Sequence, residues 1–212
     1  MKIKVVLACL FALAFAAGIW NDAQKKQPAM PVNTSADSNA SPDDKANTIS
    51  YVPRTDDEYA SIQSAASTDS LFIYKFQSDD ESINQIDCWM ERYVNGAFKE
   101  TLASVGTSLR HKRENKLYWS LTSVNDKEQM WIVSVRDEGG SSSSKGSIAK
   151  EAFLSSTWGS IIDSEKIIPG EPITLGAIVR KKEQGLTSFV RDPDKLINAF
   201  DEVYLLKCRF KA

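Results

Sequence analysis

The feature that most constrains this chain is a repeated two-residue alternation of apolar and other side chains, broken by turn-forming residues. The segment "INQIDCWMERYV" (83–94) shows it best, because Ile86, Cys88 and Met90 occupy every second position. A period of two places these side chains on one face of a β-strand. Asn95-Gly96 follows directly and is typical of a type I′ turn, which needs two positive φ angles. The pattern predicts a β-hairpin that continues into "AFKETL".

Similar short segments recur along the chain, at 71–77, 116–124, 129–136, 173–180 and 202–210. Turn signals separate them, and no alternation of strands with long helices is visible. The sequence therefore predicts a mostly β protein, an antiparallel β-sandwich of about seven or more strands, with a small β-barrel as the alternative. Trp119 and Trp131 are expected in its core.

Four segments give less regular patterns. The serine-rich stretch 138–147 is interpreted as a flexible loop from its composition. Residues 150–162 fit a short helix or a strand, and "EYASIQSAA" (58–66) fits a short helix or an extended entry segment. Residues 191–200 are expected to form a loop with about one helical turn.

The N-terminus is typical of an export segment, since two lysines precede sixteen uncharged residues, Val5 to Trp20. As a helix this run would span about 24 Å, short of the hydrocarbon core of about 30 Å, which favours a cleaved signal peptide. Trp20, followed by lysines, instead favours a retained anchor. Cys9 comes too early for a lipid anchor. Residues 1–20 are thus expected to be a signal peptide or an N-terminal membrane anchor.

Export sets the expected location, which is secreted or tethered to the outer face of the plasma membrane. Residues 21–58 are rich in Pro, Asn, Ser and Asp and predict a disordered linker. Residues 59–212 are then the β-sandwich domain. The net charge of −2 gives no reason to expect nucleic acid as a partner. Contact with a membrane is expected only through residues 5–20, if they are retained.

No catalytic or cofactor-binding constellation is visible. His111 is the sole histidine and lies in a basic segment, which favours a solvated loop residue. No metal site and no cofactor are expected. Cys88 and Cys208 both fall on apolar strand faces, so they are either a disulfide, which export permits, or two buried thiols. Acidic clusters at 54–58 and 78–82 leave a Ca²⁺-binding module and a hydrolase with paired carboxylates as alternatives.

One candidate binding surface lies on the hairpin strand. Trp89 and Tyr93 share a face with Asp87 and Glu91. On an exposed sheet these four would form a mixed aromatic and polar platform, suited to a sugar ring or a protein partner. The alternative is that a second sheet or a helix covers this face.

The C-terminal segments "EKIIPGEPITLGAIVR" (165–180) and "DEVYLLKCRF" (201–210) resemble the end of an uncharacterised family of small exported β-domain proteins from Gram-positive bacteria, some with a membrane anchor. "LFIYKF" and "CWMERYVNGAFKE" take the places of its early strands. Cys208 departs from that pattern. The resemblance implies a cell-surface β-domain and transfers no catalytic residues. We therefore expect a non-catalytic domain that binds a protein or cell-envelope component, with a small-ligand or Ca²⁺-binding module and an envelope-polymer hydrolase as alternatives.

Overall fold

The computed structural model describes residues 47–212 except 67, 111–112, 138 and 186–187. The expected export segment, Cys9 and most of the expected linker lie outside the described residues. Within the described part, neither helix is both long and apolar enough to cross a membrane.

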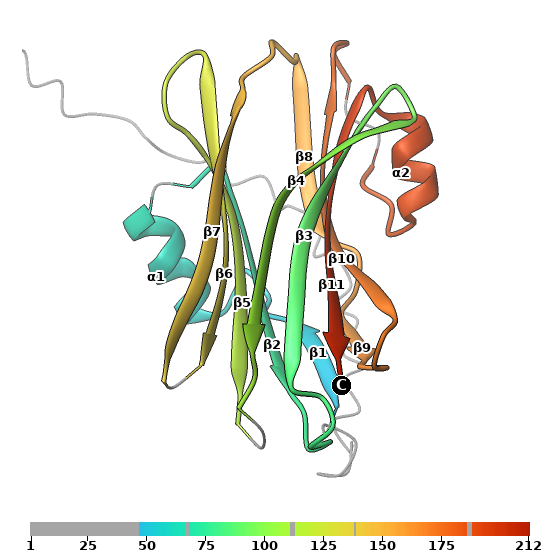
Figure 1. Ribbon diagram of the computed structural model, residues 1–212. Helices are drawn as coiled ribbons and strands as arrows, with labels where there is room; N and C mark the ends of the chain where they lie inside the picture. Colours follow the sequence, from blue (N-terminus) through green and yellow to red (C-terminus); the bar gives the residue numbers. More distant parts are fainter. Residues whose placement is uncertain (1–46, 67, 111–112, 138, 186–187) are drawn as a thin grey trace, which may run out of the picture. The chain divides into compact units, whose positions relative to one another are not determined.

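The described residues form two antiparallel sheets packed face to face (Figure 1). The first sheet has the order β7-β6-β5-β2-β1-β9 and the second β4-β3-β11-β10-β8. In the first sheet the strands are β1 (Thr48–Tyr51), β2 (Ser70–Gln77), β5 (Asn115–Ser123), β6 (Glu128–Asp137), β7 (Gly140–Ala149) and β9 (Ser164–Lys166). In the second they are β3 (Gln85–Val94), β4 (Ala97–Ser108), β8 (Ser155–Ser160), β10 (Pro172–Lys181) and β11 (Glu202–Lys211). The predicted β-sandwich is confirmed, and the alternative of a closed barrel does not form.

The core lies between the two sheets and follows the alternation of the sequence. Ile86, Cys88 and Met90 of β3 are buried, as the period of two predicts. Trp119 and Trp131 face them from the first sheet and are also buried, which confirms their expected place in the core. Between β3 and β4 the Asn95-Gly96 turn has φ angles of 50° and 79°, which confirms the predicted hairpin.

Two helices lie on the outer faces (Figure 1). The helix α1 (Asp57–Ala66) packs near β2, so the segment 58–66 is helical rather than extended. The helix α2 (Pro193–Ala199) begins after Asp192, whose carboxylate accepts from Lys195 N–H at 3.2 Å. It covers part of β10 and β11, and its Leu196 is fully buried. This cover explains why β10 is apolar on both faces.

The serine-rich segment was expected to be a flexible loop, and this expectation is wrong. Residues 140–149 form β7, paired with β6 along its whole length. Small side chains fit here, because a Cβ on Gly146 would lie only 3.0 Å from the Trp131 ring. Ser142 also bonds Thr107 of β4, with 2.9 Å between the hydroxyl oxygens. The composition indicated a loop because serine and glycine favour loops. At this edge of the sheet small residues are instead needed for packing, and the backbone of β6 supplies the hydrogen-bond partners of β7.

The ordered domain also begins earlier than residue 59. Strand β1 lies inside the segment expected to be linker and pairs with both β2 and β9. Ile49 of β1 is fully buried in the core. The pairing of β1 and the burial of Ile49 offset the entropy lost when the segment becomes ordered. The polar sequence around β1 suggested that no such compensation was available. The ambiguous stretch 150–162 contains β8, a strand.

Candidate functional site

The structure brings the four platform residues together on the outer face of β3. Glu91 is the centre of this group. Its carboxylate accepts from Trp89 Nε1 at 2.9 Å and from the Tyr93 hydroxyl at 2.7 Å. Lys207 of β11 adds an ion pair at 2.8 Å. Burial alone would raise the pKa of Glu91, but these hydrogen bonds outweigh it and hold that pKa below its usual value.

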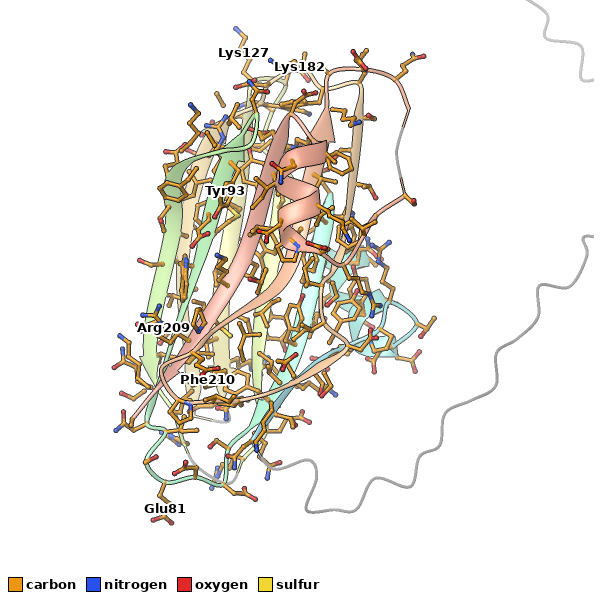
Figure 2. The ribbon with its side chains drawn as sticks, turned by 90° about the vertical axis from the view of Figure 1, so that its right-hand side faces the viewer. Glu81, Tyr93, Lys127, Lys182, Arg209 and Phe210 are labelled. Carbon is orange, nitrogen blue, oxygen red and sulfur yellow. The ribbon has the colours of Figure 1, made fainter. Side chains whose placement is uncertain are left out.

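Neither sheet covers this face, while the helix α2 packs against Tyr93 at one end of it. A shallow hollow of about 550 Å³ lies over Asp87, Trp89 and Glu91. Its aromatic and acidic groups are nevertheless engaged with their neighbours. Arg209 lies over the Trp89 ring, 5.5 Å from the centroid (Figure 2 labels Arg209 and Tyr93). Asp87 accepts from Gln85 at 2.8 Å and forms an ion pair with Lys211. The platform is therefore a surface network linked by its own hydrogen bonds.

The acidic segments do not assemble into one site in the described part of the chain. Asp56 accepts from Glu58 N–H at 2.9 Å and thereby starts α1. Asp80 accepts from the hydroxyl of Ser82 at 2.7 Å within its own turn. Among the described residues, no three His, Cys, Asp or Glu side chains gather closely enough to hold a metal ion. His111 lies outside the described residues.

Cys88 and Cys208 are free, buried thiols that lie directly opposite each other on β3 and β11. Asn95 N–H donates to the Asp201 carbonyl at 2.9 Å on the same strand pair. Hydrogen-bonded and non-hydrogen-bonded pairs alternate along an antiparallel ladder, and Cys88 lies an odd number of residues before Asn95. Cys88 and Cys208 are therefore a non-hydrogen-bonded pair, the kind in which side chains approach most closely. Burial raises the pKa of both thiols.

A second candidate site lies between the sheets, at the end of the sandwich that carries Lys127 and Lys182 (top in Figure 2). We call it the upper cleft. Here some of the inward-facing side chains are charged. Glu202 of β11 is 2% exposed and binds both Arg180, at 3.1 Å, and Arg92, at 2.7 Å. Arg180 also donates to Gln129 of β6 and so joins the two sheets.

The upper cleft is a cavity of about 330 Å³ between β2, β5 and β6 on one side and β8 and β10 on the other. The connection between β7 and β8 roofs it and is tied at both ends. Lys150 N–H donates to the Lys127 carbonyl at 2.8 Å, and Leu154 N–H donates to the Lys181 carbonyl at 3.0 Å. The cavity is therefore built by rigid strands and an anchored roof.

Two further features mark this cavity. The hydroxyl of Ser70 lines it, is buried, and has no hydrogen-bond partner among the described residues. At the rim, Lys150 donates to Ser123 at 3.1 Å, and Ser123 donates to Asp69 at 2.7 Å. A buried polar group without a partner is costly in an interior but natural where a ligand supplies the partner.

The sequence interpretation missed this site because the alternation along β10 is interrupted. In β10 a β-bulge between Thr174 and Gly176 shifts the alternation. Counting every second residue from Ile173 would place Ala177 and Val179 inward, but after the bulge they face outward under α2, while Arg180 faces the core. The available signal was Glu202, which stands in phase with the buried residues of β11 and so predicts a buried charge with a partner.

Comparisons with known proteins give one match. No curated protein and no solved structure matches this chain. The model of the YgaN domain matches residues 48–210, which begins at the first residue of β1 and ends within β11. The chain therefore belongs to the YgaN domain family.

Proposed function

We propose that this protein is an exported, non-catalytic binding domain, secreted or tethered to the outer face of the plasma membrane, that holds a cell-envelope component in the upper cleft. The observation that carries the proposal is Arg180, a nearly buried guanidinium that lines a cavity together with the unpartnered hydroxyl of Ser70. Buried ion pairs contribute little to stability compared with apolar packing. Their presence around a cavity is better explained by binding.

Binding is favoured over hydrolysis by the state of the two carboxylates that line the cleft. Asp69 accepts from Ser123, and Glu151 accepts from Arg92 at 3.3 Å. A hydrolase with paired carboxylates needs one acid and one base or nucleophile free to act on the substrate. Both groups instead hold the rim in place, and no metal or cofactor enters the proposal.

A protein partner on the outer face of β3 and β4 is the second candidate. Phe98 is 56% exposed, and its ring packs edge-on against Tyr93 with centroids 5.7 Å apart. An exposed aromatic beside a half-buried one is a feature of protein-binding surfaces. This candidate uses the platform of Asp87, Trp89, Glu91 and Tyr93 and leaves the upper cleft unexplained.

Export would also affect Cys88 and Cys208. In an oxidising compartment two opposed thiols are converted to a disulfide by exchange with a disulfide oxidant, which takes up the two electrons. We propose that the exported protein carries this bridge as a structural link between β3 and β11.

Co-sedimentation of the full chain with isolated cell-envelope material tests the binding proposal. Ser156 is exposed and lines the upper cleft, so Ser156→Trp fills the cavity from its rim. The matched control is Ser143→Trp, at an exposed position on the outer face of β7. We expect the wild type and the control to co-sediment and Ser156→Trp to remain in solution.

Equal co-sedimentation of both variants would overturn the role of the upper cleft. Phe98→Ala then separates the second candidate, because it removes the exposed aromatic without touching the cavity. If only Phe98→Ala loses co-sedimentation, the binding surface is the outer face of β3 and β4 and not the upper cleft. Circular dichroism and thermal unfolding confirm that each variant is folded.

A further inference from the structure

The charges that line the upper cleft are balanced. Lys150 and Arg180 are opposed by Asp69 and Glu151, and Arg180 is already paired with Glu202. A site for an anion such as phosphate presents an excess of positive charge and unpaired donors. The lining of the upper cleft has no such excess, so its field does not select an ion of either sign.

The polar groups that face the cavity are hydroxyls and an amide. The Ser70 hydroxyl has no described partner and can both donate and accept. Ser156 adds a second hydroxyl at the rim. Gln129 accepts from Arg180 through Oε1, and no described residue accepts from its Nε2. A ligand that carries several hydrogen-bonding groups can pair with all three, and sugar hydroxyls, which both donate and accept, are suited to this.

The cavity also has aromatic walls. Phe153 lies in the roof, with Arg180 5.6 Å from its ring centroid. Trp158 forms part of the β8 wall and contacts both Arg54, 3.6 Å from its centroid, and Phe72, with ring centroids 5.0 Å apart. Its orientation is therefore fixed before any ligand arrives. Aromatic rings pack well against the apolar C–H face of a sugar ring.

The size of the cavity limits the ligand. A volume of about 330 Å³ is near the lower end of small-molecule sites, which start at about 300 Å³. It holds one ring, while the open rim lets a longer chain continue into solvent. Resting on the proposed binding function, we infer that the upper cleft binds a single neutral sugar ring of an envelope glycan, with Phe153 as the stacking residue and Ser70 as a hydrogen-bonding residue.

Titration of the full chain with four small probes tests this inference. The probes are N-acetylglucosamine, glucose, D-alanine and inorganic phosphate, each followed by the NMR signal of the Trp158 indole N–H and by the melting temperature. We expect a neutral sugar to shift the Trp158 signal in a saturable manner and to raise the melting temperature. Trp158→Phe identifies the signal.

Two variants separate binding from folding. Phe153→Ala removes the stacking surface and is expected to weaken sugar binding about tenfold, which corresponds to the loss of one good contact. Its control, Ile168→Ala, removes an exposed apolar side chain outside the cleft and leaves binding unchanged. Ser70→Ala is expected to weaken binding while the melting temperature of the free protein stays equal or rises, because the hydroxyl has no partner there.

The outcomes distinguish this inference from the proposed function. Saturable binding of phosphate or D-alanine, with no response to either sugar, would overturn the sugar ring and leave a binding cleft. No response to any probe, with co-sedimentation still lost in Ser156→Trp, would also overturn the sugar ring alone. No response to any probe, with co-sedimentation unaffected by Ser156→Trp, would overturn both.

Discussion

Arg180 and Glu202 form a salt bridge of 3.1 Å in which both side chains are almost completely buried. They are placed by antiparallel strands, since β10 and β11 pair these two residues directly. Glu202 also binds Arg92, which is paired in addition with Glu100 and Glu151. This arrangement keeps the upper cleft polar without a net excess of either charge.

The Glu202→Gln substitution would leave both guanidinium groups without their buried counter-charge. We expect it to lower the free energy of unfolding by about 3–5 kcal/mol, the usual cost of breaking a buried pair from one side. The matched control is Glu100→Gln, because Glu100 binds the same Arg92 at 3.0 Å but is 47% exposed. That change should cost at most about 1 kcal/mol. Urea unfolding measures both, and equal costs would contradict the central role of Glu202.

The opposed thiols of Cys88 and Cys208 should react only when the chain is open. Since both are buried with a raised pKa, we expect no alkylation of either thiol in the reduced native protein and full alkylation in denaturant. Protein refolded with oxidised glutathione should instead contain the Cys88–Cys208 bridge, two daltons lighter than the reduced form.

Peptide mapping measures the alkylation and the disulfide of Cys88 and Cys208 separately from any reaction of Cys9. In the chain-entropy model, closing so long a loop adds about 4–5 kcal/mol to the free energy of unfolding. Cys88→Ala serves as the control, in which refolding under the same conditions gives no gain. Bridges between chains, or rapid alkylation of the native reduced protein, would contradict the buried register.

Much of the fold could be predicted because the strands with two distinct faces carry their pattern in the sequence. The β3–β4 hairpin is such a case, since alternation and the Asn95-Gly96 turn agree. Strand β7 could not be predicted, because it is rich in serine and glycine, a composition that is typical of loops. These small residues fit at the edge of the sheet, where Gly146 packs closely against Trp131. The pairing of β7 depends on β6 and Trp131, which the local sequence does not reveal.

The candidate site was less accessible to sequence reasoning than the fold. The platform around Glu91 follows from one strand, so its residues could be named. The upper cleft takes residues from both sheets and from the roof, and the bulge in β10 reverses the face on which Arg180 lies. Such a site depends on pairing between distant strands. In the sequence only Glu202 indicated a buried charge at this position.

The ionised form of Glu91 should stabilise the outer face at neutral pH. Hydrogen bonds from Lys207, Trp89 and Tyr93 outweigh burial and hold its folded-state pKa below the usual 4.5. A lowered pKa gives stability that is present above the unfolded value and is lost as pH falls. We expect Glu91→Gln to cost about 1–2 kcal/mol at neutral pH and less in acid. Unfolding at a series of pH values measures this difference.

Tyr93 provides an independent measure of the same contact. Burial and the hydrogen bond to Glu91 raise the pKa of Tyr93 to about 12. The neutral phenol is therefore favoured in the folded protein, and its contribution is lost only as pH rises through that value. In Glu91→Gln the tyrosine should titrate at lower pH, as followed by tyrosinate absorbance. An unchanged titration, or a cost of Glu91→Gln that grows in acid, would contradict the network.

Gly176 of β10 packs against Phe72 and Tyr74 of β2, and the packing there leaves no space for a side chain. A Cβ at this position would lie 2.8 Å from both the Phe72 ring and the Tyr74 hydroxyl, which bonds the Leu175 carbonyl at 2.7 Å. We expect Gly176→Ala to lower the free energy of unfolding by about 1–3 kcal/mol through overpacking. Gly106→Ala is the control, since its Cβ would meet the ends of two flexible side chains, the Asp87 carboxylate at 2.9 Å and the Gln85 amide nitrogen at 3.3 Å, which can swing away. Because the bulge beside Gly176 also turns Arg180 inward, Gly176→Ala should weaken ligand binding in the upper cleft while Gly106→Ala does not. Chemical unfolding and co-sedimentation of both variants check the two effects, and equal costs would show that the close approach at Gly176 is not what fixes this register.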